Sequence, residues 1–213
     1  MKPHLKLVFL FAFFSLTASV TFAQKDINRV EGFAGYSYLS LHRGLSTDDF
    51  DQSDIDAIGN RVNAHGFNGS ITGNFSRYFG ATFDFSWHRN SRTIPEFDDE
   101  KIRHDVTQFM GGIQIKDNST DGPKVKPFGR VLFGGARQTI QDSVPGGSTI
   151  DVFKATDFAM ALGGGVDIRA TRRVDIRVFQ FDYNPIFRRD HAQFDLSGGI
   201  QNNIRLSFGI VVH

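Results

Sequence analysis

Several residue types and patterns are missing from this 213-residue chain, and each absence narrows what the chain can be. It has no cysteine, which excludes disulfides, thiolate metal sites and cysteine nucleophiles. The formal net charge is +1 and the sequence has no basic stripe, so nucleic acid is not an expected partner. Proline is scarce (6 residues), whereas glycine (22) and phenylalanine (23) are abundant. This composition argues against disorder and suits closely packed strands that expose aromatic side chains.

A sustained apolar run occurs only at the start of the chain. A short basic head leads into the apolar stretch Leu5–Phe14, and small residues around Ala23 suit a signal peptidase. We predict a signal peptide over residues 1–23, cleaved after Ala23. An uncleaved membrane helix is the alternative, but the run is shorter than the ~20 residues that a helical span needs. Residues 24–213 are therefore predicted to form one domain without a helical span.

The clearest strand pattern lies between Phe67 and His88. Apolar residues or glycines alternate with polar residues in two stretches, which a short turn at residues 76–80 separates. Because successive side chains of a strand point to opposite faces, the pattern predicts two antiparallel strands. A soluble sheet would alternate too. In that alternative, an exported ligand-binding barrel resembling the lipocalins, the Phe83–Trp87 face would lie inside.

Six further stretches alternate in the same way, which brings the expected number of strands to eight. Short connections alternate with long polar ones, as in barrels whose strands run up and down through an outer membrane. An even number of antiparallel strands can close on itself, and closure removes the sheet edges that lipid cannot satisfy. The predicted fold class is all-β, an eight-stranded antiparallel up-and-down transmembrane β-barrel. Its strands are expected at residues 29–41, 67–75, 81–88, 104–116, 125–137, 157–169, 174–183 and 200–212.

The stretch 174–183 does not keep a single alternation. If Ile176 and Val178 point outward, a regular strand would also turn Gln180 and Asp182 outward. We predict a β-bulge near Phe179–Phe181 that resets the two faces. A tilted strand end at the membrane surface is the alternative.

Five segments together resemble a known family. They are VEGFAGYSYL (30–39), NGSITGNFSRYFG (68–80), KPFGRVLFGGAR (126–137), FAMALGGGVDIR (158–169) and QNNIRLSFGIVV (201–212). They resemble the small outer-membrane β-barrel family, the OmpA-like or OmpX-like domain of the porin superfamily, without a peptidoglycan-binding domain. The resemblance implies the barrel architecture and a location in the bacterial outer membrane, and it implies little about activity.

From this resemblance and the strand plan we expect a non-enzymatic structural or interaction platform. Its long extracellular loops would serve envelope integrity, adhesion or ligand recognition, and the alternative is a narrow channel for small solutes. The expected partners are outer-membrane lipids, including lipopolysaccharide, and the barrel-assembly machinery during insertion. We expect a monomer with no cofactor.

The two faces of the expected barrel predict two sets of residues. Eight strands leave an interior that side chains just fill, and buried charges need partners, so the inward charges are expected to form a packed, paired network rather than a pore lining. This network is predicted to contain Glu31, Asp84, Arg130, Asp167 and Arg205. The lipid-facing belt is predicted to contain Phe67, Ile71, Phe75, Phe83, Phe85, Trp87, Leu162, Val166, Phe208 and Ile210.

Catalytic and ligand-binding motifs are weak. Thr82, Asp84, Ser86 and His88 share one strand face and include the residue types of a serine hydrolase. However, neighbours on one face sit about 6–7 Å apart, and no oxyanion motif accompanies them. We interpret them as polar interior residues, and a lipid-modifying enzyme is the alternative. No cofactor-binding or metal-binding residues are predicted.

Three other motifs have an ordinary structural interpretation. The acidic stretch Asp48–Asp56 begins like a calcium loop but has Asp54 where a glycine is expected, so divalent-cation binding there stays open. Arg188 and Arg189 are a basic loop tip that suits lipopolysaccharide phosphates. The glycines at 163–165 lack the strand–helix setting of a nucleotide fingerprint and indicate close strand packing.

Overall fold

The computed structural model describes residues 27–42, 61–94, 100–143, 149–189 and 199–213. These residues form ten strands: β1 (Val30–His42), β2 (Arg61–Asn74), β3 (Phe79–Ile94), β4 (Glu100–Lys116), β5 (Val125–Ser143), β6 (Thr149–Arg169), β7 (Val174–Tyr183), β8 (Ile186–Arg188), β9 (Gly199–Gln201) and β10 (Ile204–Val212). Among the described residues, no helix is long and apolar enough to span a membrane.

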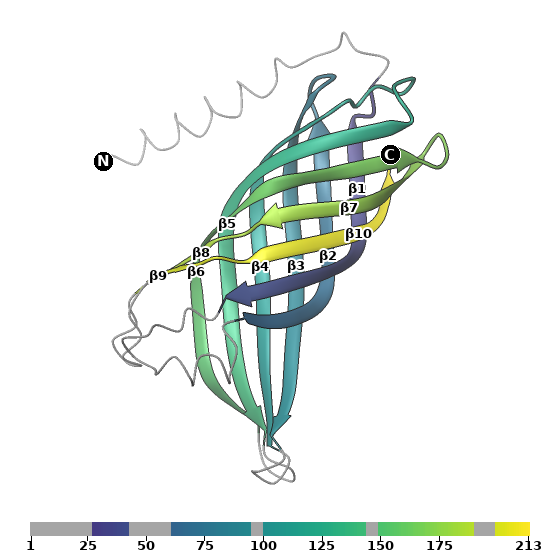
Figure 1. Ribbon diagram of the computed structural model, residues 1–213. Coiled ribbons are helices and arrows are strands. Elements are labelled where there is room, and N and C mark those ends of the chain that lie inside the picture. Colours follow the sequence, from purple (N-terminus) through teal and green to yellow (C-terminus); the bar gives the residue numbers. More distant parts are fainter. Residues whose placement is uncertain (1–26, 43–60, 95–99, 144–148, 190–198) are drawn as a thin grey trace, which may run out of the picture.

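The strands close into a single antiparallel barrel (Figure 1). Strands β1 to β6 pair in sequence order, β7 pairs with β6, and β10 pairs with both β7 and β1. The short strands β8 and β9 pair with each other, and β8 also pairs with β6. Because β8 continues β7 and β9 leads into β10, the barrel wall has eight strand positions, which confirms the predicted fold.

Two of these eight positions are interrupted, which the alternation did not predict. Pro185 has no N–H to donate to a ladder and separates β7 from β8. The eighth strand was predicted as continuous over residues 200–212 but is broken at Asn202–Asn203. The N–H of Asn184 donates to the carbonyl of Asn203 at 2.8 Å, which joins the two breaks side by side.

The two ends of the barrel differ. Three short connections, residues 75–78, 117–124 and 170–173, lie at one end, which we call the turn end. The two ends of the described chain lie there as well, because Ile27 bridges to Ser119 and the N–H of His213 donates to the carbonyl of Arg173. The strands that lead to residues 43–60, 95–99, 144–148 and 190–198 end at the opposite, loop end; those four connections lie outside the described residues.

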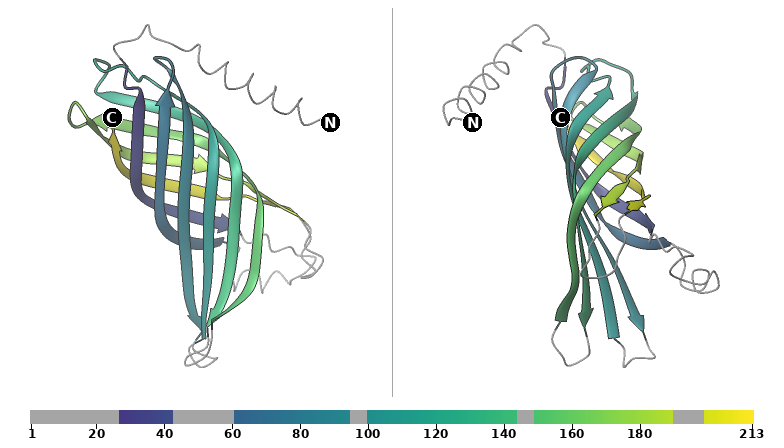
Figure 2. Two further views of the ribbon diagram at one scale, coloured as in Figure 1. Left: turned by 180° about the vertical axis from the view of Figure 1, so that it is seen from behind. Right: turned by 90° about the vertical axis from the view of Figure 1, so that its left-hand side faces the viewer.

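Strands β3 to β6 project past the rest of the barrel at the loop end (Figures 1 and 2). They contain 16, 17, 19 and 21 residues, whereas β7 and β10 contain 10 and 9. The pairing of β2 with β3 stops at His65 and Arg89, although β3 continues to Ile94 against β4. A four-stranded sheet therefore extends beyond the closed part of the barrel.

The predicted bulge in the seventh strand is present. Val166 of β6 pairs with Phe179, whereas the next residue, Asp167, pairs with Arg177, so Val178 is the extra residue. Val178 and Phe179 are both exposed. The inward positions consequently change from odd to even numbers, and Gln180 and Asp182 become buried. The bulge lies at Val178–Phe179, at the start of the predicted region.

Closure of the barrel depends on two glycines that face each other. Gly35 of β1 pairs with Gly209 of β10. A Cβ atom on Gly35 would lie 2.1 Å from the carbonyl oxygen of Phe208, and one on Gly209 would lie 2.3 Å from that of Ala34. Any side chain here would overlap the backbone of the neighbouring strand, so the contact between β1 and β10 requires glycine at both positions.

Candidate functional site

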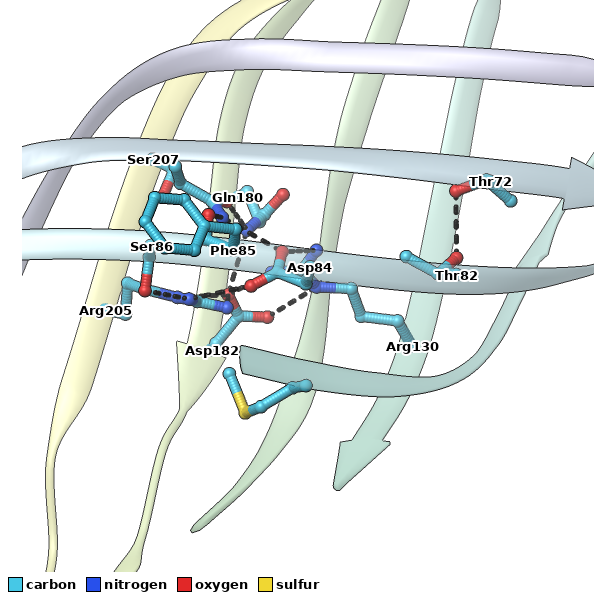
Figure 3. Close-up of polar contacts among 12 residues, drawn as sticks. Thr72, Thr82, Asp84, Phe85, Ser86, Arg130, Gln180, Asp182, Arg205 and Ser207 are labelled. Atoms are coloured by element: carbon cyan, nitrogen blue, oxygen red, sulfur yellow. Dashed lines mark hydrogen bonds and ion pairs between the residues drawn. The ribbon is translucent and has the colours of Figure 1, made fainter. Parts of the chain in front are cut away.

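The centre of the barrel holds two arginines and two aspartates from four different strands (Figure 3). Arg130 donates to Asp84 Oδ2 at 2.9 Å and to both carboxyl oxygens of Asp182 at 3.0 and 2.7 Å. Arg205 donates to Asp84 Oδ1 at 3.0 Å and to Asp182 Oδ2 at 3.1 Å. All four side chains are buried. Each buried charge therefore has two partners of the opposite sign, which offsets its loss of hydration.

A second group of charges lies nearer the turn end. Lys116 donates to Glu31 and, at 3.1 Å, to Asp167, and Arg177 donates to both oxygens of Asp167 at 2.8 and 3.1 Å. The guanidinium of Arg177 also lies over two aromatic rings, 4.3 Å from the centre of Phe33 and 4.1 Å from that of Phe128. These rings and carboxylates hold Arg177 in one position.

Gln180 connects the two groups into one network. Arg177 donates to its carbonyl oxygen at 2.7 Å, and its amide nitrogen donates to Asp182 at 2.9 Å. The network contains four acidic and four basic residues in all: Glu31, Asp84, Asp167, Asp182, Lys116, Arg130, Arg177 and Arg205. The signs balance, so this part of the interior carries no excess charge with which to select a permeating ion.

The structure brings together all five charged residues that the sequence predicted for the interior, and three more that the prediction missed belong to the same network. Lys116 follows the inward Gln114 by two residues, so extending that alternation would have found it. Arg177 and Asp182 lie on opposite sides of the bulge in β7. Because the prediction did not carry the bulge through to individual residues, it did not assign either one.

Glycine 163 makes the central cluster possible. It pairs with Arg130 of β5 on one side and with Asp182 of β7 on the other. A Cβ atom at this position would lie 2.6 Å from Asp182 Oδ1 and 2.0 Å from the carbonyl oxygen of Phe181. The glycine-rich segment of β6 therefore serves close packing, as predicted, and leaves the space through which Arg130 reaches across β6.

Two apolar clusters fill the interior toward the loop end. One contains Leu39, Leu41, Ala64 and Val106, and the other contains Met110, Leu132, Ala136, Ala159, Ala161 and Ile186. Each of these residues is at most 1% exposed. The interior therefore contains two apolar clusters beside buried polar side chains such as Gln138 and Gln201 toward the loop end, and the charged network lies nearer the turn end.

The strand face with the hydrolase-like residues does not form a triad. His88 Nε2 lies 2.8 Å from the hydroxyl of Ser37, whereas Ser86 bonds to Gln108 and to Arg205. Asp84 binds the two arginines of the central cluster. Ser86, His88 and Asp84 thus have separate partners, and the arrangement does not provide the hydrogen-bond chain that a serine nucleophile needs.

The ten residues predicted to face lipid all lie on the outside of the barrel. Phe67, Phe83 and Phe208 are strongly exposed. Phe85 and Trp87 are partly covered because their rings pack against the ring of Phe67, with centroids 5.6 and 6.0 Å apart. Contact with acyl chains remains a prediction. The soluble alternative is wrong, because it required an inward Phe83–Trp87 face and Phe83 is 55% exposed.

Two candidate binding sites from the sequence remain, the acidic stretch and the basic pair of arginines. The acidic stretch Asp48–Asp56 lies outside the described residues. Arg189 is exposed, and its backbone N–H and one guanidinium nitrogen donate to Asp157 and to the carbonyl of Thr156 at 3.3 and 3.2 Å. Arg188 is half-buried in β8. In the described part of the chain, no three acidic, histidine or cysteine side chains converge as a metal site.

Comparison of the sequence with known protein families gives one match. A family profile described as the outer membrane protein beta-barrel domain matches residues 9–210. No curated protein matches the chain.

Two solved barrels are similar to the structure. Neisserial surface protein A (NspA) is 15% identical, with a TM-score of 0.55, over 88% of this chain and 99% of that chain. Ail, the attachment invasion locus protein of Yersinia pestis, solved in complex with the heparin analogue sucrose octasulfate, is 14% identical, with a TM-score of 0.50, over 86% of this chain and 99% of that chain. At these identities the similarity establishes a shared fold.

Proposed function

Because the chain belongs to the outer membrane protein beta-barrel domain family, we propose that it is a non-enzymatic platform in the bacterial outer membrane. Barrels of this kind have short periplasmic turns and longer extracellular loops. The turn end then faces the periplasm, and the loop end presents a recognition surface to the exterior. Its roles would be adhesion, envelope integrity or ligand recognition.

The projecting sheet of β3 to β6 is the observation that carries this proposal. The outward residues of β3 are apolar from Phe79 to Trp87, which matches the ~9–11 residues that a transmembrane strand needs. The next outward residue is Arg89, and β3 continues to Ile94. The strands thus extend past the hydrocarbon as a paired sheet, which supplies a rigid surface outside the membrane.

The filled interior favours a platform over a channel. An eight-stranded barrel has room for side chains and little else. Here the room is taken by the balanced charge network and by the apolar clusters around Leu39 and Leu132. A narrow channel for small solutes is the second candidate, and it would require a path through the charge network and past the apolar clusters.

Shortening the projecting sheet tests the proposal. One variant replaces residues 91–103 with Asn-Gly, which favours a tight hairpin between Asn90 and its pairing partner His104. The variant should keep the closed barrel, seen as a heat-dependent shift in electrophoretic mobility. The Ail complex suggests a probe, so attachment of expressing cells to a heparin-coated surface is the readout. Loss of attachment supports the proposal, and unchanged attachment by a folded variant contradicts it.

Enzymatic activity is tested separately. A lipid-modifying barrel would release fatty acid from lipopolysaccharide, and we expect no release because Ser86, His88 and Asp84 have separate partners. Release that His88→Ala abolishes would contradict the non-enzymatic part of the proposal.

A further inference from the structure

The outer face of β3 to β6 changes character along a sharp boundary. Among the residues whose side chains the structure describes, the outward residues of each of these strands are apolar or glycine on the membrane side and polar on the exterior side. The first polar residue past the boundary is Arg89 on β3, Thr107 on β4, Arg137 on β5 and Thr156 on β6. This boundary is the level at which hydrocarbon gives way to lipid headgroups.

A recess of about 330 Å³ lies across this boundary. Trp87 and Phe109 line it on the membrane side, and Thr107, Arg137, Thr139 and Lys154 line it on the exterior side. The register explains why they meet: Arg137 pairs with Thr107, and Thr139 pairs with Lys154. One recess thus combines an apolar aromatic floor with two cations and two hydroxyl groups.

The charges around the recess have a clear excess of positive sign. Asp105 is its acidic residue, and it binds Arg89 through two hydrogen bonds of 2.7 and 2.8 Å. Arg89 also lies over the ring of Trp87, 4.7 Å from its centre. Arg137 has no ion pair with any described residue. With Asp105 neutralised by Arg89, Arg137 contributes a positive charge that no ion pair with a described residue offsets.

We propose that this recess binds a phosphate group of a lipopolysaccharide molecule in the outer leaflet. Arginine pairs with phosphate through two parallel hydrogen bonds, and Thr107 and Thr139 can donate further hydrogen bonds. The acyl chains attached to the headgroup would continue along the apolar side chains below, including Phe109 and Phe133. A free phosphate would make no use of this apolar floor, so the recess suits an anionic lipid.

This inference goes beyond the platform function and needs only the membrane orientation given above. Failure of cell attachment therefore does not affect it, and failure of lipopolysaccharide binding does not affect the platform.

The test uses the full-length mature barrel in detergent and purified lipopolysaccharide as the probe. The double variant Arg137→Gln, Lys154→Gln should bind at least about tenfold more weakly, because it removes the charge-assisted hydrogen bonds to the phosphate. The control variant Arg172→Gln, Arg173→Gln makes the same change of charge at the exposed turn end and should bind like the wild type. Heat-dependent mobility confirms that both variants are folded.

A second measurement needs no variant. Wild-type protein should bind dephosphorylated lipopolysaccharide at least about tenfold more weakly than the intact lipid, and raising the salt concentration should weaken binding of the intact lipid. Equal binding of the two lipids, or equal binding by the double variant, would overturn the proposal. A soluble heparin fragment that binds as tightly as lipopolysaccharide and displaces it would overturn the assignment to a lipid.

Discussion

Arg130 and Asp182 form a two-hydrogen-bond ion pair across Gly163, although they lie on strands that are not neighbours. Strand β6 separates β5 from β7, and the missing side chain at Gly163 lets the arginine pass over it. The pair therefore connects β5 to β7 inside the barrel, in addition to the backbone hydrogen bonds that each strand makes with β6.

Removing the side chain of Arg130 should lower the free energy of unfolding. Arg130→Met would leave Asp84 and Asp182 buried with fewer partners, and breaking a buried ion pair from one side typically costs about 3–5 kcal/mol. Urea unfolding of the barrel in detergent micelles should show a loss of this size. The exposed turn residue Arg172, changed to Met, should alter the free energy of unfolding by no more than about 0.5 kcal/mol. Equal stability of the two variants would show that the network is not structural.

Gly163→Ala tests the space through which Arg130 reaches. The added methyl group would overlap the carbonyl oxygen of Phe181 and crowd Asp182, and overpacking of this kind costs about 1–3 kcal/mol or more. The variant should lose its compact electrophoretic form at a lower temperature than the wild type. Gly73→Ala is the matched control, since a Cβ atom there meets nothing within 4 Å. If both variants melt alike, the close approach at Gly163 is unimportant.

The turn end should contribute a pH-dependent term to stability. Burial acts to raise the pKa of Asp117, but hydrogen bonds from Arg77 and Ser119 outweigh it and hold that pKa at about 2. An unfolded aspartate has a pKa of about 3.9. A folded-state pKa below the unfolded one stabilises the protein above about pH 4, and this stabilisation is lost as the pH falls toward 2.

Asp117→Asn measures that term directly. The difference in unfolding free energy between wild type and variant should be largest at pH 5 and should shrink steadily toward pH 2. The comparison cancels the other carboxylates, which titrate in both proteins. A difference that stays constant over this range would mean that the Arg77–Asp117 pair does not stabilise the fold.

The fluorescence of Trp87 can show how deep this part of the outer face lies in a bilayer, because Trp87 is the only tryptophan in the chain. It lies at the exterior edge of the apolar belt, beside Arg89. In bilayers its fluorescence should be quenched most by lipids brominated near the headgroup and less by lipids brominated near the end of the acyl chain. The opposite order would move the hydrocarbon boundary beyond Arg89, and absence of quenching would contradict an outward-facing belt.

The sequence was sufficient to predict the barrel because lipid imposes strict alternation wherever a strand crosses the membrane. All eight predicted strands are present, and both the five predicted interior charges and the outer aromatics follow from the same period of two. The strand ends were less well predicted. The third strand was predicted to end at His88 and the fifth at residue 137, but β3 reaches Ile94 and β5 reaches Ser143. From Arg89 and Arg137 onward the described outward residues are polar, so the pairing continues without the apolar–polar alternation on which the prediction relied.

The two apolar clusters inside the barrel were not predicted. Leu39 and Leu132 occupy inward positions on strands that also carry inward polar residues. Periodicity shows which residues face inward, but it does not show whether the inward residues of several strands form an apolar cluster. Only the packing of several strands shows that these side chains meet. The same holds for Arg130 and Asp182, whose contact depends on the bulge at Val178 and on Gly163.

Ion conductance in a planar bilayer tests most directly whether the interior is filled. The purified barrel, inserted at high protein concentration in symmetric salt, should give no stepwise current above the baseline of the lipid. Reproducible current steps, with an ion selectivity that Arg130→Ala or Arg205→Ala changes, would show an open path through the charge network and would contradict the account.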